Sequence, residues 1–206
     1  GQRPVEWLLD NTEVNERWCL IHATHMTDAE TNAFADTRAV AGLCPTTEAN
    51  LGDGLFPLEK FIYGGGRIGI GSDSNTSVDV AEELRLLEYG QRLKQKRRNI
   101  GARIEGASTG ETLFQASLVG GSQALGQPIG ILAPGYRADF IVLNNQHPVL
   151  FARTGSAIID SWVFTGGREL ISDVFVAGHH LVKNHFHIHQ ENIESRYRKT
   201  IKSLTN

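Results

Sequence analysis

Two side chains suited to acid–base chemistry or metal binding follow short apolar runs, where predicted strands end. His22 comes directly after Trp18–Ile21, and Asp73 follows Arg67–Gly71 with one serine between them. In parallel α/β layers, functional side chains gather at the carboxyl ends of the strands. An imidazole and a carboxylate that converge there can orient a water, move its proton or bind a divalent metal ion. The alternative interpretation is a core histidine and an aspartate that caps the next turn.

Other polar residues fall near the same predicted edge. The segment Thr46–Asn50 follows the second predicted strand, and His25 lies in the predicted loop after His22. The segment is a third polar group at the predicted strand ends, and His25 is a weaker candidate for contact with a ligand. The glycines between Gly64 and Gly71 resemble a phosphate-binding loop, but they lie before and within a predicted strand. A phosphate loop connects a strand to the following helix, so the geometry that cradles an anion is missing.

Three histidines alternate late in the sequence, at His185, His187 and His189. Alternate residues of a strand share a face, so a strand here would direct three imidazoles toward one metal ion. The nearest carboxylate is Glu191, and no cysteine lies nearby. We therefore favour a polar edge strand that faces solvent over metal storage. The basic run Lys94–Arg98 lacks interleaved aromatic residues and is interpreted as a solvated helix end.

The first hundred residues alternate between apolar runs and helical patterns. Continuous apolar runs, typical of strands buried on both faces, occupy 18–21, 39–44 and 67–71. Helices are predicted at 27–35, 57–63, 78–98 and 112–125. Thr27 with Glu30, and Ser108 with Glu111, have the spacing of helix-capping pairs. The small residues of the last of these helices predict close packing on its neighbours, and the alternation as a whole indicates a parallel α/β layer.

From Gly126 onward, short apolar runs are separated by proline and glycine, which predicts a β-type module. The expected strands are 139–143, 161–164 and 173–176. A final helix is predicted over 192–204, where one apolar stripe consists of Ile193, Tyr197, Ile201 and Leu204. We therefore divide the chain into an α/β segment, 1–126, and a β segment with a terminal helix, 127–206.

The composition excludes several classes of protein. The 206 residues are 40% hydrophobic and 21% charged, which excludes a disordered or collagen-like chain. A net charge of −3 provides no general attraction to nucleic acid or to an anionic membrane. Cys19 and Cys44 lie in apolar runs, which favours reduced core thiols over a disulfide scaffold. The sequence shows neither a membrane-spanning run nor a secretory signal, so we expect a cytoplasmic protein.

Several segments carry a resemblance to a known family. CLIHATHMTDAE around His22, AVAGLCPTTEANLGDGLFP, and RIGIGSDSNTSVDVAEELRLLEYGQR around Asp73 resemble the second half of deaminases of the amidohydrolase superfamily. GILAPGYRADFIVLN is similar to the passage from the barrel of these enzymes into their small β domain. The resemblance covers nearly the whole chain. It implies strands six to eight of a (β/α)8 TIM-like barrel, followed by part of a small β-sandwich domain and a terminal helix.

The resemblance also implies a chemistry. Asp73 would be a ligand of one zinc ion and would take the proton of the hydrolytic water. His22 would hydrogen-bond to that water or to the tetrahedral intermediate. The expected reaction is hydrolysis of a C–N bond in a small linear amidine, with release of ammonia, by a full-length enzyme that is a homodimer. Part of the pocket wall would come from the segment 46–54, with Glu48, Asn50 and Asp53.

Other site residues of the family have no counterpart in this sequence. The H-x-H motif after strand one is absent from its expected place, as are the histidine of strand five and the glutamate that follows it. By the resemblance, the chain is the C-terminal part of the enzyme, offers one zinc ligand of four, and is inactive alone. Two alternatives stay open: a superfamily deaminase that acts on guanine, adenosine-like or triazine substrates, and a non-catalytic fragment or interaction module.

Overall fold

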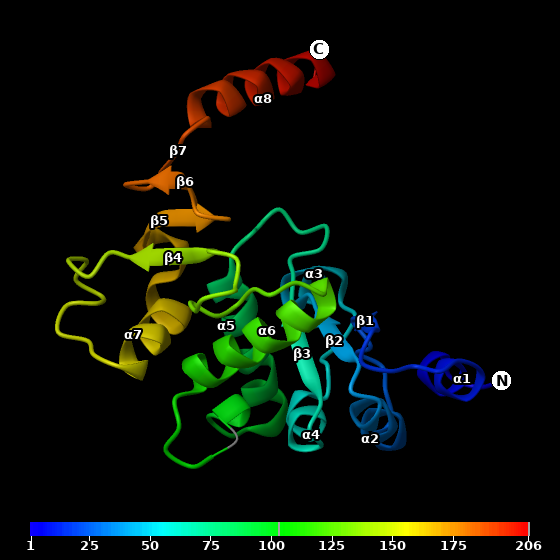
Figure 1. The fold of residues 1–206 in the computed structure, drawn as a ribbon. Coiled ribbons are helices and arrows are strands. Elements are labelled where there is room, and N and C mark those ends of the chain that lie inside the picture. The colour runs from blue at the N-terminus through cyan, green and yellow to red at the C-terminus, as the bar shows by residue number, and fades with distance from the viewer. Residues whose placement is uncertain (103, 206) are drawn as a thin grey trace.

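The computed structural model describes residues 1–102 and 104–205, and its strands form two sheets (Figure 1). The first sheet is parallel, and its strands in spatial order are β1 (Cys19–Ile21), β2 (Val40–Leu43) and β3 (Arg67–Ile70). The second is antiparallel, and its strands in spatial order are β4 (Phe140–Leu143), β5 (Ile171–Val176), β6 (His179–Lys183) and β7 (Phe186–His187). The predicted α/β class with a following β module is therefore confirmed.

Helices connect and cover the strands of the parallel sheet. Those between or after its strands are α2 (Asp28–Asp36), α3 (Pro45–Leu51), α4 (Leu58–Tyr63), α5 (Val80–Gln95) and α6 (Thr109–Leu125). The remaining helical elements are α1 (Pro4–Asn11), η1 (Ile100–Ala102), α7 (Ser156–Ser161), the π-helical η2 (Trp162–Gly166), η3 (Gly167–Leu170) and α8 (Gln190–Thr205). In Figure 1, α3 lies near the upper ends of the parallel strands, whereas α2 and α4 lie near their lower ends.

Capping residues mark the starts of three helices close to the positions predicted from the sequence. The Thr27 hydroxyl accepts the amide of Glu30, and the Glu30 carboxylate accepts the amide of Thr27, which completes the predicted capping box of α2. Ser108 accepts the amide of Glu111 at the start of α6. The carboxylate of Asp79 accepts two backbone amides and begins α5. These bonds satisfy amides that have no partner within the first turn of a helix.

The hydrophobic core joins the parallel sheet to the helices around it. Phe61 contacts two other buried rings, Phe34 at a centroid distance of 4.8 Å and Phe56 at 5.1 Å. Trp162 of η2 is almost fully buried and packs edge to face on Phe114 of α6, at 5.1 Å. The segment between β4 and β5 therefore packs on the α/β layer and contributes to the same core.

The small residues of α6 allow a close approach to β3, as the sequence predicts. A Cβ atom at Gly120 would lie 1.9 Å from the carbonyl oxygen of Ile68, so only glycine fits there. A Cβ atom at Gly121, the next residue, would meet no atom within 4 Å. The close packing of α6 on β3 therefore depends on one glycine of the pair.

Two details of the sequence prediction are wrong. Residues 161–164 are helical, because α7 ends at Ser161 and η2 follows it. Trp162 and Val163 are buried there, and an apolar run fits a buried helical turn as well as a strand. β1 is also less buried than predicted, with 37% of Trp18 and 54% of Ile21 exposed. β1 lies at the edge of its sheet, and no strand among the described residues pairs with its outer side.

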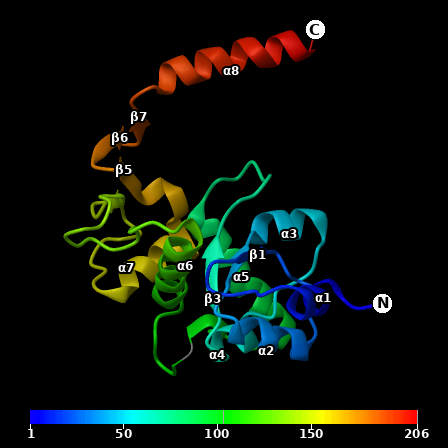
Figure 2. The same ribbon diagram turned by 45° about the vertical axis from the view of Figure 1, so that its right-hand side comes forward.

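The terminal helix is confirmed as α8, with its apolar stripe on the outside. Ile193, Tyr197, Ile201 and Leu204 are each at least 41% exposed. Figure 2 shows α8 lying apart from the layer that contains the parallel strands, above the rest of the chain. Within residues 1–102 and 104–205, no helix is long and apolar enough to cross a membrane.

Candidate functional site

The two residues singled out for chemistry meet at the carboxyl edge of the parallel sheet. His22 follows β1 and Asp73 follows β3, and Nε2 of His22 lies 3.6 Å from Oδ2 of Asp73. β2 lies between the two strands, so the side chains reach each other across its end. The His22 side chain is 34% exposed and that of Asp73 is 42% exposed, which leaves both accessible to a ligand.

The backbone at this edge has an uncommon conformation. His22, Ala23 and Asp73 have φ values of 65°, 48° and 50°, in the left-handed region that side chains other than glycine rarely adopt. The amide of His22 donates to the carbonyl of Gly42 at 2.9 Å, which continues the sheet pairing up to the turn. Such conformations are concentrated at functional sites, where surrounding structure holds them. The turns direct both side chains to the same edge.

Glu48 is a third member of the cluster, although the sequence predicted for its segment only ligand contact or a place in the pocket wall. It lies on α3, a helix that the sequence patterns did not predict. Its Oε1 atom lies 3.3 Å from Nδ1 of His22 and accepts the backbone amide of Cys44 at 2.9 Å. Glu48 is only 4% exposed. A glutamate shortly after the helix-initiating Pro45 was the only local signal for this contact.

Two further contacts hold α3 in place beside the site. The buried carboxylate of Glu83 on α5 accepts the amide of Thr46 at 2.9 Å and its hydroxyl at 2.5 Å. Burial raises the pKa of Glu83, although the two hydrogen bonds from Thr46 oppose the shift. The hydroxyl of Thr47 donates to the carbonyl of Ser72 at 2.8 Å, which ties α3 to the residue before Asp73. The position of Glu48 is therefore set by contacts on both sides of its helix.

The two cysteines are free thiols, as predicted. Cys44 is buried next to the site, and burial, followed by the negative charges of Glu48 and Asp73, raises its pKa to about 11. A thiol with that pKa stays protonated at neutral pH and is a poor nucleophile. Cys19 is half-buried, and burial raises its pKa as well. Among the side chains at this edge, the imidazole and the carboxylates are therefore the groups suited to acid–base chemistry or metal binding.

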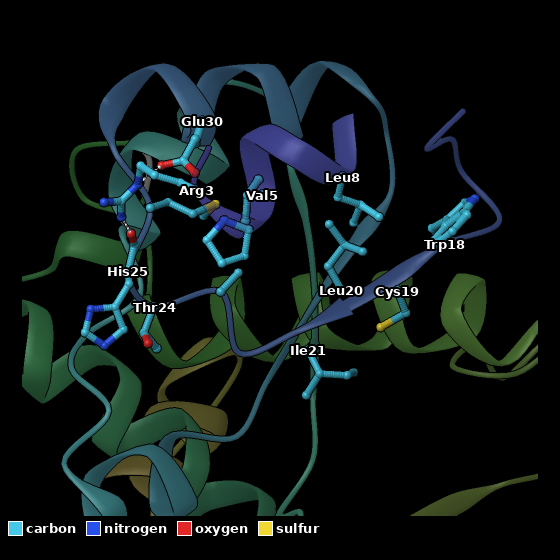
Figure 3. Close-up of a pocket in the computed structure, with 13 residues that line it drawn as sticks. Arg3, Val5, Leu8, Trp18, Cys19, Leu20, Ile21, Thr24, His25 and Glu30 are labelled. Carbon is cyan, nitrogen blue, oxygen red and sulfur yellow. Dashed lines mark hydrogen bonds and ion pairs between the residues drawn. The ribbon is translucent and has the colours of Figure 1, made fainter. Parts of the chain in front are cut away.

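His25 does not join the cluster. It lines a separate pocket of about 480 Å³ beside β1 and α1 (Figure 3). The walls of this pocket are mostly apolar side chains, such as Val5, Leu8 and Leu20, and the carbonyl oxygen of His25 accepts a hydrogen bond from Arg3. Asn50 is exposed on α3 and, within the described part of the chain, forms no hydrogen bond or ion pair with His22 or Asp73.

The histidines of the β module also stay apart from the site. β7 contains only Phe186 and His187 and forms the edge of its sheet, so the predicted edge strand is confirmed for His187, whereas His185 and His189 lie in turns outside the strand. The ring centroids of His187 and His189 lie 5.7 Å apart, and Nδ1 of His187 accepts the amide of His189. The glycines from Gly64 onward end α4 and lead into β3, away from any helix start that could bind an anion.

The donor atoms at the sheet edge suit part of a zinc site. Imidazole nitrogen and carboxylate oxygen are both zinc ligands, and a tetrahedral site needs four of them or three with a water. No group of three or more histidine, cysteine, aspartate or glutamate residues suited to a metal is found in the part of the chain that the structure describes. His22 and Asp73 can therefore supply a share of such a site, and further ligands would have to come from elsewhere.

Comparison with known proteins relates this chain to one enzyme family. Residues 3–181 match the amidohydrolase family. The chain is 52% identical over 191 residues to the formimidoylglutamate deiminase of Pseudomonas aeruginosa, and the match covers 93% of this chain and 42% of that protein. It is 28% identical over 147 residues to the 5-methylthioadenosine/S-adenosylhomocysteine deaminase of Pyrococcus abyssi, covering 70% of this chain and 33% of that protein.

Solved structures agree with this relationship. The crystal structure of an amidohydrolase from Brucella melitensis matches with a TM-score of 0.93 and 45% identity, over 100% of this chain and 45% of that one. An adenosine deaminase from Xanthomonas campestris with bound zinc matches with a TM-score of 0.80 and 23% identity, over 98% of this chain and 46% of that one. The second likeness concerns the fold alone. The chain thus spans less than half the length of these relatives.

Proposed function

The chain belongs to the amidohydrolase family, and we propose that it is the C-terminal part of a zinc-dependent formimidoylglutamate deiminase. The reaction would convert N-formimino-L-glutamate and water into N-formyl-L-glutamate and ammonia, a step of histidine degradation. The observation that carries this proposal is the distance of 3.6 Å between Nε2 of His22 and Oδ2 of Asp73 at the carboxyl edge of the sheet. It is supported by the 52% identity of the chain to an enzyme with this activity.

The two side chains have complementary tasks in this proposal. Zinc, when bound, supplies a Lewis acid that lowers the pKa of water toward neutrality. Asp73 would help to hold the metal and would take the proton from the attacking water. His22 would hydrogen-bond through Nε2 to the oxygen that adds to the formimino carbon. As the C–O bond forms and the C=N double bond becomes single, Asp73 would pass the first water proton to the former imino nitrogen. As the C–N bond then breaks, the hydroxyl proton of the intermediate would move to the same nitrogen, so that the carbonyl of the formyl group forms and ammonia departs.

The domain division at residue 126 is part of the same proposal. Residues 1–126 would form barrel strands six to eight with their helices, and residues 127–206 would form part of the small β domain with the terminal helix. The break between the parallel and antiparallel sheets supports this division. We also propose that the complete enzyme is a cytoplasmic homodimer and acts on a small molecule, without nucleic acid or membrane as partner.

The test is ammonia release by the longer polypeptide that contains this chain, with N-formimino-L-glutamate, S-adenosylhomocysteine, guanine and a triazine as parallel substrates. Release from N-formimino-L-glutamate alone is expected. Preferential turnover of S-adenosylhomocysteine would favour the deaminases that are 25–28% identical to this chain. The isolated 206 residues are expected to bind no catalytic zinc and to release no ammonia. Robust turnover by that fragment, with its intact mass verified, would contradict this expectation.

A further inference from the structure

We propose that Glu48 is a positioning residue that holds His22 by its Nδ1–H group and so turns Nε2 toward Asp73. The part of this inference that concerns catalysis rests on the proposed function. The part that concerns the imidazole proton rests on the geometry of the site. Glu48 is not adjacent to either residue in the sequence, and it reaches His22 only because α3 folds against the carboxyl edge of the sheet.

The imidazole lies between two carboxylates that face different ring nitrogens. Oε1 of Glu48 is 3.3 Å from Nδ1, and Oδ2 of Asp73 is 3.6 Å from Nε2. The Glu48 side chain is 5% exposed, whereas that of Asp73 is 42% exposed. Glu48 is therefore buried in the protein, whereas the carboxylate of Asp73 is open to solvent.

Glu48 has little freedom to move away from the imidazole. Its Oε1 atom also accepts the amide of Cys44 at 2.9 Å, and its helix is anchored by the Thr46 contacts to Glu83 and by the Thr47 contact to Ser72. A carboxylate fixed by a backbone amide and by a helix is a rigid acceptor. A loop side chain would pay more conformational entropy to hold the same geometry.

A carboxylate accepts hydrogen bonds and donates none, so the proton of the His22 ring must be on Nδ1 for this contact to stabilise the pair. The second ring nitrogen, Nε2, then faces Asp73 with its lone pair or second proton available to the reacting oxygen. The hydrogen bond made by one imidazole nitrogen decides the role of the other. Without Glu48, the ring could exchange its tautomer and rotate about its side-chain torsions.

The direct test is the tautomer of His22, measured from side-chain 15N chemical shifts in the longer polypeptide that contains this chain, labelled with 15N-histidine. His22→Asn identifies the signal. We expect a protonated Nδ1 in the wild type and a shift of proton occupancy toward Nε2 in Glu48→Ala. Glu48→Gln keeps an acceptor oxygen and the amide contact with Cys44, so it should largely preserve the wild-type pattern. Glu59→Gln, which removes a carboxylate on α4, is the charge-matched control and should change nothing.

Kinetics distinguish positioning from a merely structural role. Loss of the outer hydrogen-bond partner of a metal-ligating histidine typically costs about 10–100-fold in activity, and we expect an effect of the same size for His22. Glu48→Ala should therefore lower kcat by about that factor with KM nearly unchanged, and Glu48→Gln should recover most of the loss. A change in KM alone, or an unchanged His22 tautomer in folded Glu48→Ala, would overturn the inference. If the tautomer responds but N-formimino-L-glutamate is not hydrolysed, the positioning role stands and the proposed function fails.

Discussion

Nε2 of His22 lies 3.6 Å from Oδ2 of Asp73, although β2 separates the two strands that precede these residues. The contact is possible because β1, β2 and β3 run in the same direction, so their carboxyl ends lie at one edge of the sheet. The left-handed backbone at both residues turns the side chains over the end of β2. This pair defines the part of the candidate site that the chain contains, and its roles can be tested by substitution.

Replacement of Asp73 by asparagine should abolish most activity and leave the fold intact. The variant loses a proton acceptor, and proton transfer by a positioned side chain contributes about 10²–10⁴-fold to rate. It should also lower the zinc content of the longer polypeptide. Asp73 is 42% exposed, so the free energy of unfolding should change by less than about 0.5 kcal/mol. Ammonia release, metal analysis and urea unfolding measure these effects, and full activity in Asp73→Asn would exclude the proposed role.

Two neighbouring glycines of α6 should respond oppositely to alanine. Gly120→Ala would place a methyl group 1.9 Å from the carbonyl oxygen of Ile68, so α6 must move away from β3. We expect destabilisation of about 1–3 kcal/mol, the usual cost of overpacking. Gly121→Ala is the matched control, because its methyl group meets no atom within 4 Å and alanine favours a helix by about 1 kcal/mol over glycine. Thermal or urea unfolding of both variants would show whether the close approach is real, and equal stabilities would contradict it.

Glu88 should be more important for stability than an equivalent exposed glutamate. It is fully buried and accepts the amides of Ile100 and Gly101, each at 2.9 Å, and Nε of Arg92 at 2.7 Å. Glu88→Ala leaves two buried amides and a cation without their acceptor, which should cost about 3–5 kcal/mol.

The control for this experiment is another glutamate–arginine pair with the same spacing. Glu194 and Arg198 lie 3.2 Å apart on the exposed surface of α8. Glu194→Ala should change the free energy of unfolding by less than about 1 kcal/mol, because exposed ion pairs contribute little. Comparable losses in the two variants, measured by urea denaturation, would show that burial of Glu88 is not the cause.

Glu30 should make stability depend on pH in the acidic range. Burial opposes its charge, but hydrogen bonds from the Thr27 amide, Arg3 and the Glu6 amide outweigh burial and lower its pKa from 4.5 to about 2. Because the folded state favours the carboxylate, the stabilisation is fully present above about pH 4.5 and is lost as the pH falls toward 2.

The corresponding measurement compares urea unfolding of the wild type and Glu30→Gln between pH 6 and pH 2. The difference in free energy of unfolding should be largest near neutral pH and should shrink through the acidic range. Arg3→Ala should reduce the pH dependence of the free energy of unfolding by a smaller amount, because Glu30 loses only one of its several hydrogen-bond partners. A difference that stays constant with pH would show that the pKa of Glu30 is not lowered in the folded state.

Much of the fold could be predicted from the sequence because its signals are local. The capping residues Thr27 and Ser108 mark helix starts within one turn, and the apolar runs before His22 and Asp73 mark strands. Because strand–helix alternation implies parallel strands, the convergence of His22 and Asp73 at one edge followed from the same patterns. The chemistry proposed for them followed from residue type, since imidazole and carboxylate are groups that exchange protons and bind divalent metal ions.

The remaining features were decided by packing between distant segments. The run 161–164 is apolar enough for a strand, but it packs on α5 and α6 as a buried helical turn. The exposure of β1 depends on which strands lie beside it, which its own residues do not encode. The contact of Glu48 with His22 depends on where α3 packs. The position of α3 is fixed by hydrogen bonds from its residues to Glu83 and to Ser72. Sequence periodicity reports the local shape and polarity of a segment, whereas the partner of each buried group is set by contacts between elements that only the tertiary structure brings together.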